Sequence, residues 1–345
     1  MKTIIDNIDE KNIDENILIK YANLIKNGET VILPTETVYG LGANALDENA
    51  VAKIYEAKGR PSDNPLIVHI DSIEKVNELA QNINYKAKKV MNKFWPGPIT
   101  IILDKKEIVP NKTSGGLKTV ALRMPNNNIF LKLISLSETP IAAPSANISG
   151  KPSPTKSKHV VEQMNNRVSG IICGNDCDFG IESTIVDFTE ETPVILRPGS
   201  ITKEELESEI GEVLIDKSLL KKEDNINAKA PGMKYKHYSP NAEVFIVDGN
   251  NIFENVNNLI RENKSKNLVT GVICIDENQD KYDCEVINLG SDLDEVGKNL
   301  FASLIDMDNK NIDIIYSEYF GNNGVGMAVM NRLLKSAGYK VIKFD

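Results

Sequence analysis

One irregular stretch divides the chain into two regions of regular pattern. Residues 217–240 read KSLLKKEDNINAKAPGMKYKHYSP, and they show neither the two-residue period of a strand nor the 3.6-residue period of a helix. On both sides, short apolar runs alternate with amphipathic ones, which is typical of α/β domains. Irregular runs of this length are uncommon inside a compact domain, so this one predicts a linker. We expect one domain over residues 1–216, a linker over 217–240 and a second domain over 241–345.

The first region predicts a twisted mixed sheet with helices. Its last strands follow one another like hairpins, which favours a mixed sheet over a purely parallel one. The expected strands span residues 30–33, 66–70, 99–103, 119–123, 141–143, 170–173, 183–188 and 194–197. The expected helices span residues 48–55, 72–80, 85–94, 128–136 and 156–164.

The second region predicts a small α/β domain in which strands and helices alternate regularly. The expected strands span residues 243–247, 269–275, 285–288 and 312–316, with helices over 253–262, 294–306 and 326–336 and a short last strand.

The charge distribution restricts the partners of the protein. The formal net charge is −9, from 40 Lys and Arg against 49 Asp and Glu. Residues 241–345 hold 10 basic and 17 acidic residues, which leaves 30 and 32 for residues 1–240. This balance counts against a broadly basic surface that coats nucleic acid, but it allows a basic cleft in the first domain.

The chain has the features of a cytoplasmic protein. The four cysteines are few for its length, which indicates a reducing compartment. The first twenty residues lack the apolar core of a signal peptide and the arginine bias of a transit peptide, and no run of about 18 apolar residues predicts a membrane span. We expect cytoplasmic localisation and no membrane contact.

The first polar cluster follows the strand at residues 30–33. The run VILPTETVYGLGANALD places Thr37 and a second threonine on a turn before two glycines. Hydroxyls and free backbone amides on such a turn suit a small polar ligand or an oxyanion. The alternative is a helix cap against which Tyr39 packs.

The second cluster, EAKGRPSDNPLIVHI, places Lys58 and Arg60 on a loop framed by glycine and proline, with Asn64 after them and His69 in the next strand. Arginine binds phosphate oxygens as a fork and lysine as a point charge, so the pair suits a polyphosphate. The alternatives are a solvated charge pair and, for His69, a satisfied interior imidazole.

The third cluster, TPIAAPSANISGKPSPT, runs from a short strand into a series of hydroxyl and amide side chains, including Ser145, Asn147 and Ser153. Such a stretch cannot form a core but can present polar groups to a ligand. The alternative is a plain serine-rich loop.

Further polar residues lie on strands or at strand ends, and they are Thr119, Arg123, Ser183 and Arg197. Arg123 and Arg197 each end an apolar strand before a proline, so both are expected to point into one crevice. Together these residues predict a basic, hydroxyl-lined cleft that suits an anionic nucleotide.

Other common sites are not indicated. The chain lacks the G-x-x-x-x-G-K-[ST] phosphate loop, and the run GNNGVGMAVMNR differs from a dinucleotide fingerprint in spacing and position. Cys173 and Cys177 have no second ligand pair nearby, and the three histidines are scattered. We therefore predict no zinc site and no acidic metal cluster.

The ordered motifs together resemble a known family. PTETVYGLG, KGRPSDNPL, FWPGPIT, APSANISG and ESTIVDF, in this order, resemble the YrdC-like threonylcarbamoyl-AMP synthases. PGMKYKHYSP in the linker and the run from Gly324 to Ala337 resemble the branch with a Rossmann-like second domain. The resemblance covers nearly the whole chain and implies a YrdC-like first domain.

The resemblance also implies a reaction and its residues. L-threonine, bicarbonate and ATP give threonylcarbamoyl-AMP and pyrophosphate, with Mg²⁺ held mainly by ATP, and a separate protein machinery transfers the group to tRNA beside the anticodon. The implied catalytic tetrad is Lys58, Arg60, Ser145 and Asn147. The implied threonine-binding residues are Thr37, His69, Arg123, Ala143 and Ser183. The implied ATP-binding residues are Arg60, Asn64, Thr119, Ser145, Ser153, Arg197 and Tyr238.

Two further interpretations follow from the resemblance. Because carbamates and acyl adenylates decompose in water, the linker with its basic and aromatic residues is expected to close over the cleft as a lid. The main alternative function is a double-stranded RNA-binding or ribosome-associated protein, since YrdC-like folds also bind RNA. A carbamoyl transferase of the hydrogenase-maturation type is disfavoured because the chain lacks its additional segments.

Overall fold

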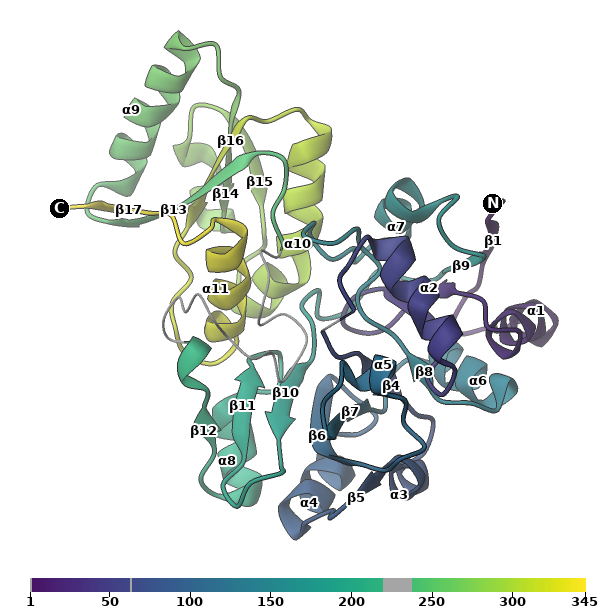
Figure 1. The fold of residues 1–345 in the computed structure, drawn as a ribbon. Helices are drawn as coiled ribbons and strands as arrows, with labels where there is room; N and C mark the ends of the chain where they lie inside the picture. The colour runs from purple at the N-terminus through teal and green to yellow at the C-terminus, as the bar shows by residue number, and fades with distance from the viewer. Residues whose placement is uncertain (1, 63, 220–237) are drawn as a thin grey trace.

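The computed structural model describes residues 2–62, 64–219 and 238–345. Its first domain is built on a twelve-stranded sheet that contains both parallel and antiparallel pairs, so the expectation of a mixed sheet is confirmed (Figure 1). The strand order is β1-β9-β2-β3-β8-β4-β7-β6-β10-β11-β12, and β5 pairs with β6. The strands are β1 Ile4–Asn7, β2 Val31–Leu33, β3 Gly40–Asn44, β4 Ile67–His69, β5 Ala80–Gln81, β6 Ile99–Lys105, β7 Thr119–Arg123, β8 Ile141–Ala142, β9 Gly170–Cys173, β10 Thr184–Asp187, β11 Val194–Arg197 and β12 Leu214–Ile215.

The helices of the first domain pack on this sheet through their apolar faces. They are α1 Glu15–Lys26, α2 Glu48–Lys58, α3 Val76–Leu79, α4 Tyr85–Phe94, α5 Asn111–Ser114, α6 Asn128–Ser137, α7 Ser157–Met164 and α8 Lys203–Ile210. Every strand and helix predicted for this domain is present, although the helix expected over residues 72–80 is a short 3₁₀ turn followed by α3.

Seven strands and α-helices in the described part of the first domain were not predicted, and they are α1, α5, α8, β1, β3, β5 and β12. Helix α1 and strand β1 lie in the charged N-terminal run, and α8 begins at a Thr202–Glu205 capping box. Strand β3 lies where a turn was expected. A Cβ atom at its Gly42 would approach Ile141 and Leu33 to within 3 Å, so glycine is needed there for close packing and is not a sign of a turn.

The second domain has the predicted Rossmann-like architecture. Five parallel strands follow the order β15-β14-β16-β13-β17, which requires helical crossovers between neighbours. The strands are β13 Glu243–Gly249, β14 Thr270–Cys274, β15 Glu285–Asn288, β16 Ile314–Glu318 and β17 Val341–Phe344. The helices are α9 Ile252–Ser265, α10 Leu293–Asn309 and α11 Val325–Ser336.

Helices α10 and α11 face the first domain (Figure 1). On α10, the Asp306 carboxylate lies 3.0 Å from both Lys158 Nζ and His159 Nε2 of α7. Gly180 of the first domain adopts φ +67°, and a Cβ atom there would lie 2.1 Å from the backbone oxygen of Lys298. The two domains therefore meet backbone against backbone at this point.

Candidate active site

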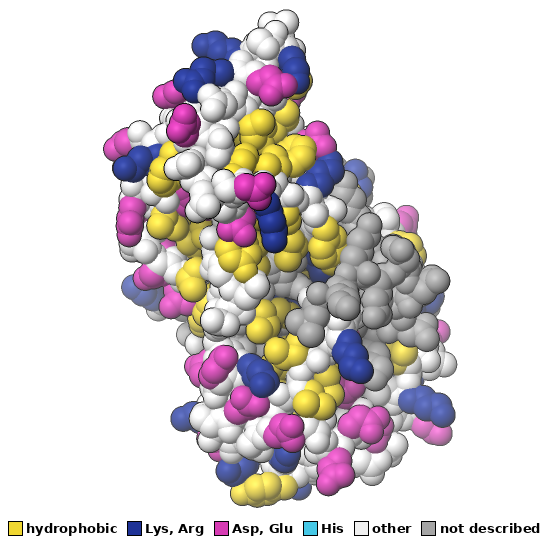
Figure 2. Space-filling model, turned by 90° about the vertical axis from the view of Figure 1, so that its left-hand side faces the viewer, with side chains coloured by type: hydrophobic (Ala, Val, Ile, Leu, Met, Phe, Trp, Pro, Cys, Tyr) yellow, Lys and Arg dark blue, Asp and Glu magenta, His cyan; other side chains and the backbone are white. Residues whose placement is uncertain are grey.

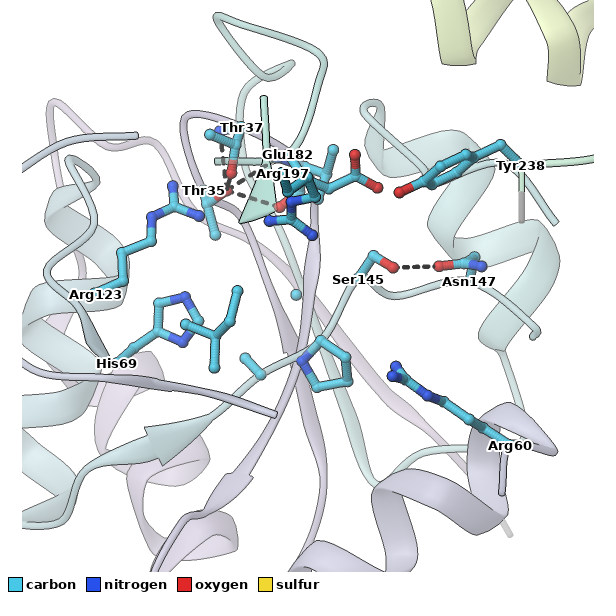
Figure 3. A pocket seen from close by; sticks show the side chains of 15 residues that line it. Thr35, Thr37, Arg60, His69, Arg123, Ser145, Asn147, Glu182, Arg197 and Tyr238 are labelled. Atoms are coloured by element: carbon cyan, nitrogen blue, oxygen red, sulfur yellow. Dashed lines mark hydrogen bonds between the residues drawn. The ribbon is translucent and has the colours of Figure 1, made fainter. Parts of the chain in front are cut away.

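A cavity of about 60 Å³ opens in the first domain, beside its contact with the second (Figure 3). Strands β4 and β7 are parallel neighbours whose last residues, His69 and Arg123, are paired in register. The residues that line the pocket are Thr35, Thr37, Val38, Gly40, Arg60, Ile67, His69, Arg123, Ala143, Pro144, Ser145, Asn147, Glu182, Arg197 and Tyr238.

Thr35 fixes the turn that follows β2. Its hydroxyl donates to the backbone oxygen of Val38 at 2.7 Å and accepts from the backbone amides of Thr37 and Val38. It also lies 2.9 Å from the Thr37 hydroxyl. This turn is therefore held by its own side chains, which is the arrangement expected of threonine in a tight turn.

A buried ion pair marks one end of the pocket. Arg123 Nη2 lies 2.7 Å from Glu36 Oε2, and both side chains are almost fully buried. The Arg123 guanidinium also donates through Nε to the backbone oxygen of Gly97 at 3.3 Å. Glu36 accepts a further hydrogen bond from the backbone amide of Asn126. These contacts fix a positive group beside the cavity.

His69 lies next to this pair and is neutral. Burial, with the positive charge of Arg123, lowers the pKa of His69 to about 3. Its ring is tilted against Phe130, with 4.9 Å between centroids. Nδ1 is buried and has no hydrogen-bond partner among the described residues. The imidazole can exchange hydrogen bonds with a ligand but does not act as a proton donor near neutral pH.

Lys58 was expected on a loop, but it is the last residue of helix α2. Its Nζ donates to the backbone oxygens of Ser145 at 2.5 Å and Asn147 at 2.7 Å, and to Asn147 Oδ1 at 3.2 Å. Burial and the charge of Arg60 lower the pKa of Lys58 well below its usual value. Lys58 therefore holds the 145–147 loop and does not line the cavity.

Ser145 and Asn147 are joined by a 2.5 Å hydrogen bond from the Ser145 hydroxyl to Asn147 Oδ1. The Asn147 amide also donates to the backbone oxygens of Ile148 and Lys151 at 2.8 Å. Figure 3 shows both side chains on the same side of the pocket as Arg60, away from Arg123 and His69. The pocket therefore has two chemically distinct ends.

Glu182 and Arg197 lie between these ends. Glu182 Oε1 accepts a 2.8 Å hydrogen bond from the Ser153 hydroxyl. Arg197 donates to the backbone oxygen of Ser183 at 3.0 Å and to its hydroxyl at 3.1 Å. Burial lowers the pKa of Arg197 to about 10, so its guanidinium remains charged at neutral pH.

Tyr238 covers the pocket from the side of the second domain. Its ring is tilted against Phe301 of α10 with 4.9 Å between centroids, and its hydroxyl points toward Glu182 (Figure 3). Burial and the negative charge of Glu182 raise the pKa of Tyr238. The following residue, Ser239, donates its backbone amide to the oxygen of Gly150 at 2.8 Å. The end of the linker is thus attached to the first domain beside the pocket.

The structure brings most of the predicted site residues together. Those that line the cavity are Thr37, Arg60, His69, Arg123, Ala143, Ser145, Asn147, Arg197 and Tyr238. Those outside the lining are Lys58, Asn64, Thr119, Ser153 and Ser183. Three of the latter contact lining residues through their side chains: Lys58 with Asn147, Ser153 with Glu182 and Ser183 with Arg197.

Sequence reasoning missed Glu182 and the pairing of Glu36 with Arg123. Glu182 precedes the predicted Ser183, and Glu36 lies between the two threonines of the first cluster. A buried carboxylate is rarely left unpaired, so an acidic residue inside an apolar or hydroxyl-rich run is the signal that could have pointed to both.

No group of three or more His, Cys, Asp or Glu side chains suited to a metal ion occurs in the described ranges. The two carboxylates at the pocket are each engaged by an arginine, Glu36 by Arg123 and Glu182 by Arg332. The described residues therefore do not fit a resident metal ion held by the protein.

Comparison with known proteins gives two family matches in succession. The Sua5, YciO and YrdC model, described as telomere recombination, matches residues 23–199. A model described as the C-terminal domain of threonylcarbamoyl-AMP synthase matches residues 201–338.

Full-length relatives are also found. The threonylcarbamoyl-AMP synthase of Pyrococcus abyssi is 50% identical over 344 residues, covering 99% of each chain. That of Bacillus subtilis is 43% identical over 350 residues, covering 99% of this chain and all of the relative. The crystal structure of P. abyssi Sua5 complexed with L-threonine superposes with a TM-score of 0.95 at 49% identity, covering 99% of this chain and 100% of that one.

Proposed function

The chain belongs to the threonylcarbamoyl-AMP synthase family, and from this premise we propose that its pocket binds L-threonine at the Arg123 end and ATP at the Arg60 end. Its activity is the synthesis of threonylcarbamoyl-AMP, which serves the threonylcarbamoyladenosine modification of tRNA next to the anticodon. The observation that carries the proposal is the division of one cavity between a buried Arg123–His69 pair and a separate Arg60–Ser145–Asn147 group.

The threonine end would work as follows. Arg123 binds the carboxylate, and Glu36 keeps the guanidinium in place from behind. Thr37 and the neutral His69 hydrogen-bond the amine and hydroxyl of the substrate, and the unpartnered Nδ1 of His69 supports this role. Ala143 leaves room for the ligand, while Ser183 acts through Arg197, which its hydroxyl contacts.

The nucleotide end would use Arg60, Ser145 and Arg197 for the phosphates. Tyr238 packs against the ligand from the end of the linker, and Thr119 and Ser153 complete this end. Asn64 is fully buried, and both polar atoms of its side chain lack partners among the described residues. Since unpaired buried amides are costly, this supports a ligand contact for Asn64.

The proposed reaction depends on the orientation of the substrates, and no side chain of the protein acts as a covalent nucleophile. The threonine amine combines with bicarbonate to give a carbamate and water. A carbamate oxygen then attacks the α-phosphorus of ATP in line, and pyrophosphate leaves. Arg60 and Arg197 stabilise the charge on the phosphates, while Lys58 fixes the loop that carries Ser145 and Asn147.

Magnesium would enter with the substrate. Because the carboxylates at the pocket are paired with arginines, we assign no protein ligand to Mg²⁺ and expect the triphosphate to hold it. No step of the proposed chemistry depends on a metal site in the protein.

The lid hypothesis concerns residues 217–240, of which residues 220–237 lie outside the described part of the chain. Tyr238 is described, and its place in the pocket wall supports a role for the end of this segment in closing the site. The proposed division into residues 1–216, 217–240 and 241–345 is compatible with β12 ending at Ile215 and β13 beginning at Glu243.

We propose a cytoplasmic protein that delivers its product to separate tRNA threonylcarbamoyl transfer machinery. None of the helices in the described ranges has the length and apolar character needed to cross a bilayer. On the face in Figure 2, basic and acidic side chains are interspersed and form no broad basic field, which gives no support to the double-stranded RNA-binding alternative.

The decisive experiment measures pyrophosphate release from ATP by the full chain with and without L-threonine and bicarbonate. We expect release to require both, and mass spectrometry to detect threonylcarbamoyl-AMP. Release that is equally fast without threonine would contradict the proposed substrates.

A further inference from the structure

Arg332 of α11 is a fully buried arginine that crosses from the second domain into the first. Its Nε lies 3.1 Å from Glu182 Oε2, and its Nη2 donates to the backbone oxygen of Glu182 at 3.1 Å. Its Nη1 donates to the backbone oxygen of Pro198. One guanidinium from the second domain thus holds two separate segments of the first.

These two segments flank the residues that support Arg197. Pro198 follows Arg197 directly, and Glu182 precedes Ser183, which accepts both hydrogen bonds from the Arg197 guanidinium. The Glu182 carboxylate also accepts from Ser153 at 2.8 Å. Arg332 therefore contacts Glu182, whose carboxylate holds Ser153, and Pro198, which follows Arg197.

Arg332 is one of the groups that keep Glu182 ionised. Burial raises the pKa of Glu182, but the charges of Arg332 and Arg197 and the Ser153 hydrogen bond lower it to about 2. Without Arg332, a buried carboxylate would remain in the pocket wall with less compensation. It would then compete with the triphosphate for Arg197 or take up a proton.

We propose that Arg332 is a positioning residue through which the second domain sets the nucleotide end of the active site. Its guanidinium is engaged by Glu182 and by the backbone oxygen of Pro198 and lies outside the cavity lining, so it acts on substrate only through other residues. It acts by holding Glu182 and Pro198, and so fixes the Ser153 hydroxyl and the Arg197 guanidinium. The inference rests on the proposed function, in which Ser153 and Arg197 serve ATP.

A purely structural role is the competing explanation. The domains have other contacts away from the pocket, such as Asp306 with Lys158 and His159. If Arg332 only attached the domains, its loss would resemble the loss of Asp306. Asp306→Asn is therefore the matched control.

The test compares Arg332→Met, Arg332→Lys and Asp306→Asn in the full chain. Steady-state pyrophosphate release gives KM for ATP and for threonine, and circular dichroism gives the melting temperature. We expect Arg332→Met to raise KM for ATP about tenfold or more, with KM for threonine within about threefold. Arg332→Lys keeps the charge but loses the fork and should show a smaller shift of the same kind. Asp306→Asn should leave both KM values unchanged.

A double mutant tests whether Arg332 acts through Glu182. If it does, adding Glu182→Gln to Arg332→Met should restore part of the lost ATP affinity, because the neutral amide no longer requires a guanidinium. The inference is overturned if Arg332→Met lowers only the melting temperature, if both KM values rise equally, or if the two substitutions are additive. Should Arg332→Met not fold, Arg332→Lys and the double mutant decide by the same criteria.

Two first-domain variants separate this inference from the assignment on which it rests. If Ser153→Ala and Arg197→Met leave KM for ATP unchanged, the ATP end is assigned wrongly. If they raise it and the Arg332 variants do not, only the positioning role is wrong.

Discussion

Lys58 and Asn147 are joined by two hydrogen bonds, from Lys58 Nζ to the backbone oxygen of Asn147 at 2.7 Å and to its Oδ1 at 3.2 Å. The same Oδ1 accepts from the Ser145 hydroxyl, so the lysine also determines where that hydroxyl points. A residue outside the cavity thereby controls two residues inside it.

Lys58→Met should reduce both activity and stability. The substitution leaves the backbone oxygens of Ser145 and Asn147 without their donor, so we expect a loss of about 3 kcal/mol in unfolding free energy and about 100-fold in kcat/KM. Lys53→Met, on the same helix in a surface pair with Glu29, should change stability by less than about 0.5 kcal/mol. Urea unfolding and pyrophosphate release check both variants. Equal effects of the two substitutions would contradict the role of Lys58.

Arg123→Lys should weaken threonine binding selectively. A lysine cannot contact Glu36 and the substrate carboxylate with one planar fork, so we expect about a tenfold loss in threonine affinity. Affinity for a non-hydrolysable ATP analogue should change by less than about threefold. Isothermal titration of each ligand checks this, with the exposed Arg167→Lys as control. Equal losses of affinity for threonine and for the ATP analogue would contradict the assignment of Arg123 to the threonine end.

His69 should make the protein less stable in mild acid. Its pKa is about 3 in the folded chain against an ordinary value of about 6.5, so between these values the unfolded chain binds a proton that the folded chain does not. Stability therefore falls as pH falls through this window, by about 2 kcal/mol from this group at pH 5. Urea unfolding at pH 7 and pH 5 should show that His69→Gln loses this part of the pH dependence. Identical pH dependence in both proteins would mean that the imidazole is not buried in its neutral form.

Tyr238→Ala should weaken the use of ATP and leave the first domain folded. The substitution removes the ring packed on Phe301 and opens the pocket wall, so KM for ATP should rise about tenfold. Tyr238→Phe keeps the ring and should have a smaller effect, while Tyr319→Ala, at an exposed tyrosine of the second domain, should have none. Unchanged threonine-dependent pyrophosphate release by Tyr238→Ala would remove the support for closure by this segment.

Local pattern predicted much of the fold because apolar periodicity is a local property. Strands β7, β9, β11 and β15 and helix α4 have the predicted bounds. Helix α1 was missed although Leu18, Tyr21, Ala22 and Ile25 have helical spacing, because the surrounding charges hid the pattern.

The pocket was predicted from runs of polar residues at strand ends, and the resemblance assigned their roles. The supporting contacts were not predictable in this way. Glu182 and Arg332 are 150 residues apart, and only folding brings the carboxylate to the guanidinium. Lys58 has the sequence setting of a phosphate ligand, yet the path of α2 directs its amine to backbone oxygens.

Gly180 has a consequence for anyone who builds chimeras of such proteins. A single methyl group at Gly180 would collide with the backbone of Lys298. The first domain can therefore pack only against a second domain whose backbone comes equally close to Gly180. A second domain exchanged between relatives must therefore match the surface around Gly180 as well as supply the arginine for Glu182. The two domains are successive in the sequence, but their contact surfaces match each other and they act as one enzyme.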